Sequence, residues 1–196
     1  MPRTHRPTSM TRVLAAATLA FGLAVLAPSA PVQATPAQAA PAPAGVKAEI
    51  IRSIEDAEKK LIALAERFPQ EKYAWHPEGA RTTSEVFMHI AAANYAYGGL
   101  MGAARAEGKT GVALSKITEK AQLVETLKDS FTYIKAAIVN APDVEKTIKL
   151  RAGDATLREA MIGAATHCHE HMGQLIAYAR VNGIVPPWNE APPAKN

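Results

Sequence analysis

The sequence has very little cysteine: Cys168 is the only one in 196 residues. An intramolecular disulfide is therefore excluded, and the fold has to be held by packing even in an oxidising compartment. The sequence also lacks a hydrophobic run of the roughly 20 residues that a membrane-spanning helix needs. Strand-like alternation of apolar and polar residues never extends beyond a few positions, so the pattern favours helices.

Acidic residues are missing from the first 45 positions, which contain three arginines, Arg3, Arg6 and Arg12. An uncharged apolar run at 13–27 follows them, and then a stretch rich in small residues and proline with Ala-x-Ala-like sequences. This order is typical of a secretory signal peptide. We therefore expect a signal peptide at 1–34 that is cleaved on export, leaving a secreted or periplasmic protein without stable membrane insertion. An uncleaved membrane anchor is the alternative, and a lipid anchor is disfavoured because no cysteine lies near the cleavage region.

The charge gives no indication of a nucleic-acid partner. The chain has 22 Lys and Arg against 18 Asp and Glu, and three of the arginines lie in the expected signal peptide. The rest of the chain therefore has 22 − 3 = 19 basic and 18 acidic residues, a net charge of +1. Binding to nucleic acid would need a concentrated basic patch, so we expect none. About 150 residues remain, which suits one domain with its own core.

Apolar residues at three- and four-residue spacing predict four helices. We place them at about 46–67, from 82 to just before Gly108, at 118–139, and from 156 to just before Gly183. Helices of about 20 residues pack as an all-α four-helix bundle. We assign this bundle to residues 46–188, an Ala/Pro-rich linker to 35–45 and a C-terminal tail to 189–196. The loop at 106–117 is long enough to cross the end of the bundle.

Three of the expected helix ends carry their own signals. Thr82 with Glu85, and Thr156 with Glu159, form capping boxes in which each side chain bonds the other residue's free backbone N–H. Gly183 supplies a C-terminal cap for the last helix, and the two prolines that follow it prevent continuation.

Several motifs of known chemistry are absent from the sequence. The cluster at 167–171 reads His-Cys-His-Glu-His rather than HExxH, and no GxSxG, P-loop, dinucleotide fingerprint or haem attachment motif occurs. Glu85 and His89 are four residues apart, whereas di-iron carboxylate bundles use Glu-x-x-His twice. These absences disfavour a ferritin-like di-iron centre and an exported four-helix cytochrome.

Helix geometry separates the three clustered histidines. Each residue of a helix turns by about 100°, so His167 and His171 lie about 40° apart on one face while His169 points away. Apolar residues, including Leu157 and Leu175, share the face of the pair, which therefore points into the bundle. Burying two imidazoles is costly unless they are hydrogen-bonded or bind something. An i,i+4 pair is a common way for one helix to bind a metal ion.

His89 is the candidate for a third ligand. It leans inward on the second helix, and Ala92, Ala93 and Ala96 leave free volume beside it. Three neutral imidazoles leave coordination positions open for water or substrate, as in catalytic rather than structural metal sites. Gln174 lies about 60° from His171 around the helix, where it either lines the pocket or serves helix packing. We identify no general base.

Each of these residues also has a purely structural interpretation. A single inward histidine such as His89 is usually a hydrogen-bonded core residue, and the pair on the last helix has the same alternative. Cys168 is better explained as a small core residue than as a ligand. We expect His169 to be exposed to solvent and His76 to be a loop residue that at most borders the site.

The chain resembles the DinB-like (damage-inducible, YfiT-type) family of four-helix metalloproteins. The single histidine of the second helix stands in Glu-Val-Phe-Met-His89-Ile. The last helix follows the family ending HxxxHxGQLxxYxRxxGxxPP closely, from His167 to Pro187. The loop sequence Tyr-x-Trp-x-Pro at 73–77 also looks familial, and the resemblance covers essentially the whole chain after the expected signal peptide.

The resemblance implies one divalent metal ion, zinc, nickel or iron, bound by His89, His167 and His171. Some relatives are thiol-dependent transferases or isomerases, others are metal-dependent hydrolases, and members are often homodimers. An export signal is unusual for an enzyme that depends on a cytosolic thiol. A thiol transferase is therefore a less favoured function for this chain. The alternatives are a non-enzymatic module that binds metal or a small-molecule ligand without turnover, and a structural bundle with hydrogen-bonded histidines. A polar group converging on the metal would favour an enzyme, and Tyr178 and Asn94 are the candidates.

Overall fold

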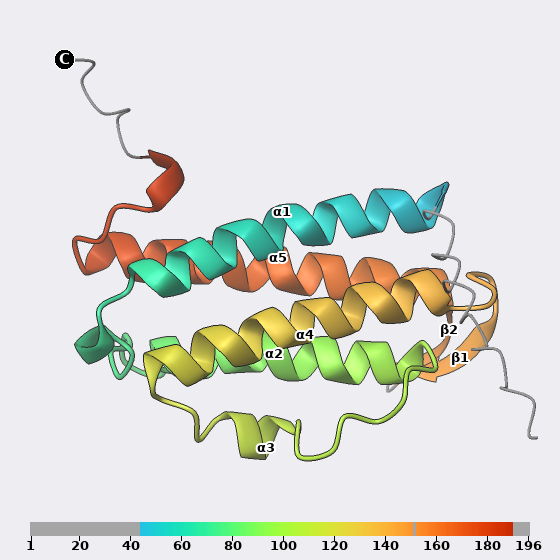
Figure 1. The fold of residues 1–196 in the computed structure, drawn as a ribbon, viewed down its shortest axis with the longest axis horizontal. Coiled ribbons are helices and arrows are strands. Elements are labelled where there is room, and N and C mark those ends of the chain that lie inside the picture. The colour runs from blue at the N-terminus through green and yellow to red at the C-terminus, as the bar shows by residue number, and fades with distance from the viewer. Residues whose placement is uncertain (1–43, 151, 190–196) are drawn as a thin grey trace, which may run out of the picture. The chain divides into compact units, whose positions relative to one another are not determined.

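The computed structural model of the chain describes residues 44–150 and 152–189, and four long helices dominate that part (Figure 1). They are α1 (Val46–Arg67), α2 (Thr83–Leu100), α4 (Lys120–Asn140) and α5 (Leu157–Val181). The predicted all-α four-helix bundle is therefore confirmed. The predicted signal peptide at 1–34 and nearly all of the linker and tail lie outside the described residues, so those boundaries stay predictions.

The helices pack in a ring in which each one contacts two neighbours. α2 packs on α4 and α5, and α1 packs on the same two helices. α1 connects to α2 through a loop that contains the short 3-10 helix η1 (Gln70–Lys72). A second 3-10 helix, η2 (Pro187–Asn189), follows α5.

The long connection at 101–119, here called the crossover, contains the one-turn helix α3 (Gly111–Leu114). In Figure 1, α2 and α4 run in the same direction, so the crossover returns along the length of these two helices. The loop, which is long enough to cross the end of the bundle, instead runs along its side. A connection between parallel helices has to span a helix length, which is about 27 Å for the 18 residues of α2.

The second helix is also shorter than the sequence predicted. α2 ends at Leu100 rather than just before Gly108, because Gly102 adopts a positive φ of 93° and the N–H of Ala103 bonds back to the carbonyl of Gly98. This left-handed ending stops a helix. Ala104, which the apolar spacing assigned to the helix, instead lies in the crossover, where its carbonyl accepts a hydrogen bond from Tyr133.

A β-hairpin that the sequence did not predict joins α4 to α5. β1 (Thr147–Leu150) pairs antiparallel with β2 (Gly153–Thr156), with Ile148 opposite Ala155. Strands of four residues are too short to give a clear alternation. Thr156 ends β2 and also caps α5, and both predicted capping boxes are present in the structure.

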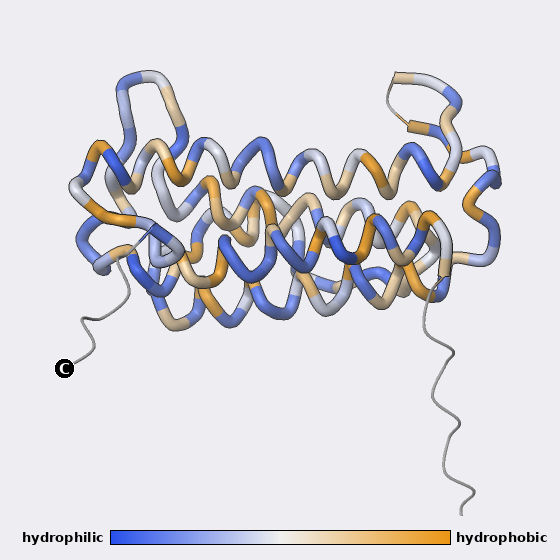
Figure 2. The backbone as a smooth tube through the Cα atoms, turned by 90° about the horizontal axis from the view of Figure 1, so that it is seen from above, coloured by the Kyte–Doolittle hydropathy of each residue, from blue (hydrophilic) through white to orange (hydrophobic). Residues whose placement is uncertain are grey.

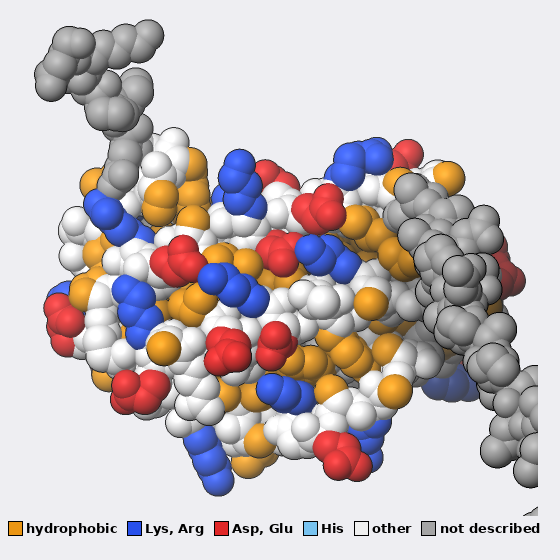
Figure 3. Space-filling model, in the orientation of Figure 1, with side chains coloured by type: hydrophobic (Ala, Val, Ile, Leu, Met, Phe, Trp, Pro, Cys, Tyr) orange, Lys and Arg blue, Asp and Glu red, His pale blue; other side chains and the backbone are white. Residues whose placement is uncertain are grey.

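The core lies between the four long helices. Its fully buried side chains come from all of them, among them Leu61, Ile90, Leu127, Ile134, Met161 and Leu175. Hydrophobic and hydrophilic positions are interspersed along the helical bundle (Figure 2), as expected when part of each helix surface is buried. On the face shown in Figure 3, acidic and basic side chains are intermixed. No helix within the described ranges has the length and apolar character needed to span a membrane.

Candidate metal centre

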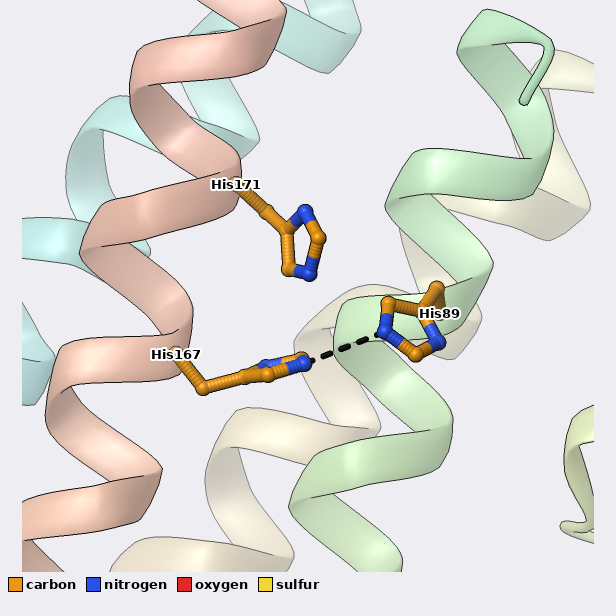
Figure 4. Close-up of side chains that lie close together, drawn as sticks. All are labelled: His89, His167 and His171. Carbon is orange, nitrogen blue, oxygen red and sulfur yellow. Dashed lines mark hydrogen bonds between the residues drawn. The ribbon is translucent and has the colours of Figure 1, made fainter. Parts of the chain in front are cut away.

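The structure brings the three predicted histidines together. His89 projects from α2, and His167 and His171 project from successive turns of α5 (Figure 4). The Nε2 atoms of His89 and His167 are 3.1 Å apart. One ring nitrogen from each of the three residues lies within 4.8 Å of the other two, and no other group of three or more His, Cys, Asp or Glu side chains in the described part of the chain has this spacing.

The rings converge without stacking. Their centroids are 4.9 Å apart for His89 and His167, 4.8 Å for His89 and His171, and 4.5 Å for the α5 pair. All three side chains are half-buried. The α2–α5 interface therefore encloses three imidazoles that point at a common space while remaining partly open to solvent.

Both the donor set and the spacing fit a transition metal ion. Imidazole nitrogens bind zinc at roughly 2.0–2.1 Å, so two of them on a tetrahedral ion lie roughly 3.4 Å apart. The observed separations of up to 4.8 Å are within a small rotation of the side chains from that value. The Nδ1 atom of His167 is buried and has no hydrogen-bond partner among the described residues.

A hydrogen-bond chain fixes the tautomer of His171. The carbonyl of Arg81 can only accept, so the Tyr178 hydroxyl donates to it over 3.1 Å. The Tyr178 oxygen in turn accepts from Nε2 of Gln174 over 2.9 Å. The Gln174 Oε1 atom therefore faces His171 and accepts from its Nδ1–H over 2.9 Å. The Nε2 atom of His171 is left with a free lone pair, as a metal ligand requires.

Burial keeps two of the imidazoles neutral. It lowers the pKa of His167 to about 4, with smaller contributions from His171, His89 and Arg81. Burial is also the main cause that lowers the pKa of His89, with Arg81 and His171 acting in the same direction and Glu170 opposing them. Neutral imidazole is the form that binds metal ions, so these two histidines are available as ligands at neutral pH.

Two functional candidates were missed by the sequence reasoning. Arg81 and Glu85 line a pocket of about 240 Å³ whose wall also includes His89 and the α3 residues Gly111 and Val112. Arg81 acts electrostatically on both His89 and His167. Arg81 directly precedes the capping box of α2, and that position at the helix start was the only sequence signal for it.

The remaining sequence candidates do not join the cluster. Cys168 is fully buried, its Sγ contacts Oδ1 of Asn94 at 3.5 Å, and burial raises its thiol pKa to about 12, as expected of a core residue. His169 is half-buried rather than exposed, and its Nδ1 lies 2.9 Å from the carbonyl oxygen of Ala165. His76 is exposed in the loop before α2, with its Nδ1 3.0 Å from the carbonyl oxygen of Pro77.

The fold and the cluster define a helical bundle with a three-histidine centre between two of its helices. The model of the DinB superfamily matches residues 53–175, and the chain belongs to this superfamily. The family resemblance drawn from the last helix is thereby confirmed. No protein of curated function matches the sequence significantly.

Solved structures show the same fold at low sequence identity. A DinB-like protein, YjoA, from Bacillus subtilis superposes with a TM-score of 0.57 and 18% identity over 70% of this chain and 93% of that protein. A mycothiol-dependent maleylpyruvate isomerase also gives a TM-score of 0.57, at 14% identity over 76% of this chain. This chain covers 65% of the isomerase's length.

Proposed function

We propose that this protein binds one divalent transition metal ion through His89, His167 and His171 and uses it in a hydrolytic or group-transfer reaction. The observation that carries the proposal is the convergence of three imidazole nitrogens within 4.8 Å from two helices. Zinc, nickel and iron all accept imidazole ligands. Three protein ligands leave coordination positions free, which is typical of catalytic sites.

A bound ion would supply Lewis acidity and would lower the pKa of a bound water or thiol. The chain's own residues have separate tasks around it. Gln174 and Tyr178 hold the ring of His171 in one tautomer. Arg81 and Glu85, on the wall of the 240 Å³ pocket beside His89, offer one cation and one carboxylate to a polar substrate. Water is the proposed nucleophile, and this choice rests on the export proposed below, since an exported protein would have no access to a cytosolic thiol.

Binding of metal or ligand without turnover is a second candidate function, and the hydrogen bonds that already engage the polar candidates Asn94, Tyr178 and Glu85 favour it. Asn94 is engaged with Ser130 and Cys168, and Tyr178 with Gln174 and the Arg81 carbonyl. Glu85 reaches the pocket but is tied into its capping box, where backbone and side-chain hydrogen bonds from Thr82 hold its pKa below the usual range.

Reconstitution separates the two candidates. The metal-free protein is loaded separately with zinc, nickel or iron(II), and each form is tested against a panel of esters, amides and phosphoesters with negatively charged and neutral members. We expect turnover of at least one member of the panel, and this turnover should disappear with a chelator and in His89→Ala. Stoichiometric metal binding with no turnover across the panel would contradict the enzymatic proposal and support the binding module.

We also propose that the protein is exported and that the segment at 1–34 is removed, on the strength of its basic, apolar and small-residue order. Mass spectrometry of protein from a native-like host should show an N-terminus between about residues 30 and 42. An intact N-terminus would contradict cleavage and favour an anchored form.

A further inference from the structure

A second and larger pocket lies along α2 beneath the crossover. Its volume is about 420 Å³, within the range of roughly 300–1,000 Å³ that is usual for small-molecule sites. Its floor includes Ala92 and Ala96 of α2, which begin one helical turn beyond His89. None of the three histidines contributes to its wall.

The wall of this pocket is apolar and aromatic. Tyr95 of α2 and Tyr133 of α4 both line it, with ring centroids 5.1 Å apart and planes inclined by 53°. Alanine and glycine residues make up much of the remaining lining. Two tyrosine rings beside small side chains form a surface on which a flat aromatic body can pack.

Two positively charged side chains stand at the same pocket. Arg105 and Lys109, both from the crossover, line it, and no carboxylate of the described part of the chain does. The Lys109 ammonium lies 5.7 Å from the centroid of the Tyr95 ring. Within the described ranges, neither cation forms an ion pair with an acidic side chain. Such groups are free to pair with a carboxylate on a ligand.

The aromatic wall is held in place before any ligand binds. The Tyr133 hydroxyl donates to the carbonyl of Ala104 over 2.8 Å, which ties the crossover to α4. The Tyr133 ring lies so close to the backbone of Gly98 that a Cβ atom there would overlap it. A preformed wall reduces the ordering cost of binding.

We propose that this pocket binds a small aromatic carboxylate, whose ring packs on Tyr95 and Tyr133 and whose acid group pairs with Lys109 and Arg105. Gly111 lines both this pocket and the one beside His89, so the two adjoin beneath the crossover. A ligand held here lies next to the histidine centre. The inference does not depend on metal binding, because its residues are separate from the three histidines.

The test uses purified protein stripped of metal with a chelator, so that failure of the metal proposal does not affect it. Calorimetric titration measures the affinity for 2-naphthoate and for the uncharged 2-naphthamide. Lys109→Met removes the charge and keeps the length of the side chain. Lys116→Met is the matched control, because Lys116 is an exposed residue of the same crossover that does not line the pocket.

We expect one 2-naphthoate per chain, with an affinity about tenfold above that of 2-naphthamide, since a charge-assisted hydrogen bond distinguishes the two. Lys109→Met should remove most of this difference by weakening 2-naphthoate alone, while Lys116→Met should stay within about twofold of the unmodified protein. Equal affinity for the two probes, no saturable binding, or the same loss in both variants would each overturn the proposal.

Discussion

Gln174 should control metal affinity without touching the metal. Its Oε1 accepts the Nδ1–H of His171 over 2.9 Å, and its amide donates to Tyr178. Gln174→Met keeps the length of the side chain and removes both bonds. The His171 ring then loses the contact that fixes its tautomer and orientation.

The structure sets the size of the expected effect. Loss of an outer-shell partner of a metal-binding histidine typically weakens binding by about 10- to 100-fold, equivalent to about 1.4–2.8 kcal/mol. Gln174→Glu supplies a stronger acceptor at the same place, so it should retain or raise the affinity.

Competition with a chromophoric chelator at fixed pH measures these affinities. Gln122→Met is the matched control, because Gln122 is exposed on α4, away from the histidines. If Gln174→Met binds metal within about twofold of the unmodified protein while His89→Ala does not bind, the orienting role assigned to Gln174 is wrong.

Two further predictions concern stability. Gly98→Ala should lower the free energy of unfolding in urea by about 1–2 kcal/mol, because the added Cβ would overlap Tyr133. Gly99→Ala is the control: its Cβ meets nothing within 4 Å, so it should raise the free energy of unfolding by up to about 1 kcal/mol. Equal effects of the two substitutions would contradict the packing of Tyr133 on Gly98. The lowered pKa of His167, about 4 against 6.5, means that the unfolded chain binds more protons than the folded chain between these values. The free energy of unfolding of the metal-free protein should therefore fall as the pH is lowered from 6.5 to about 4. Because His167 is partly screened by solvent, we expect the free energy of unfolding to change by about 1–2 kcal/mol across this window. In His167→Gln the free energy of unfolding should depend less on pH. An unchanged pH dependence in that variant would show that His167 is not the group responsible.

Local signals in the sequence predicted the helices well. The capping residues Thr82 and Thr156 mark the starts of α2 and α5 because side chains within four residues decide a cap. The end of α2 was misplaced because apolar spacing continues past Leu100, while the positive φ of Gly102 ends the helix. Glycine permits that conformation without requiring it, so the sequence alone did not place the stop.

The candidate site shows the same division between local and tertiary information. Helix phase paired His167 with His171 and turned His169 away, because that relation is fixed within one helix. The place of His89 opposite them depends on how α2 packs against α5 and came from the family resemblance. Arg81 and the two pockets depend on the path of the crossover over α2, which no local pattern encodes.

Elemental analysis of protein purified without added metal and without a histidine tag tests the central claim most directly. The account predicts about one transition metal ion per chain, lost in His89→Ala and in His171→Ala and retained in His169→Ala, whose ring lies outside the cluster. Equal metal content in all three variants would contradict a centre built from His89, His167 and His171.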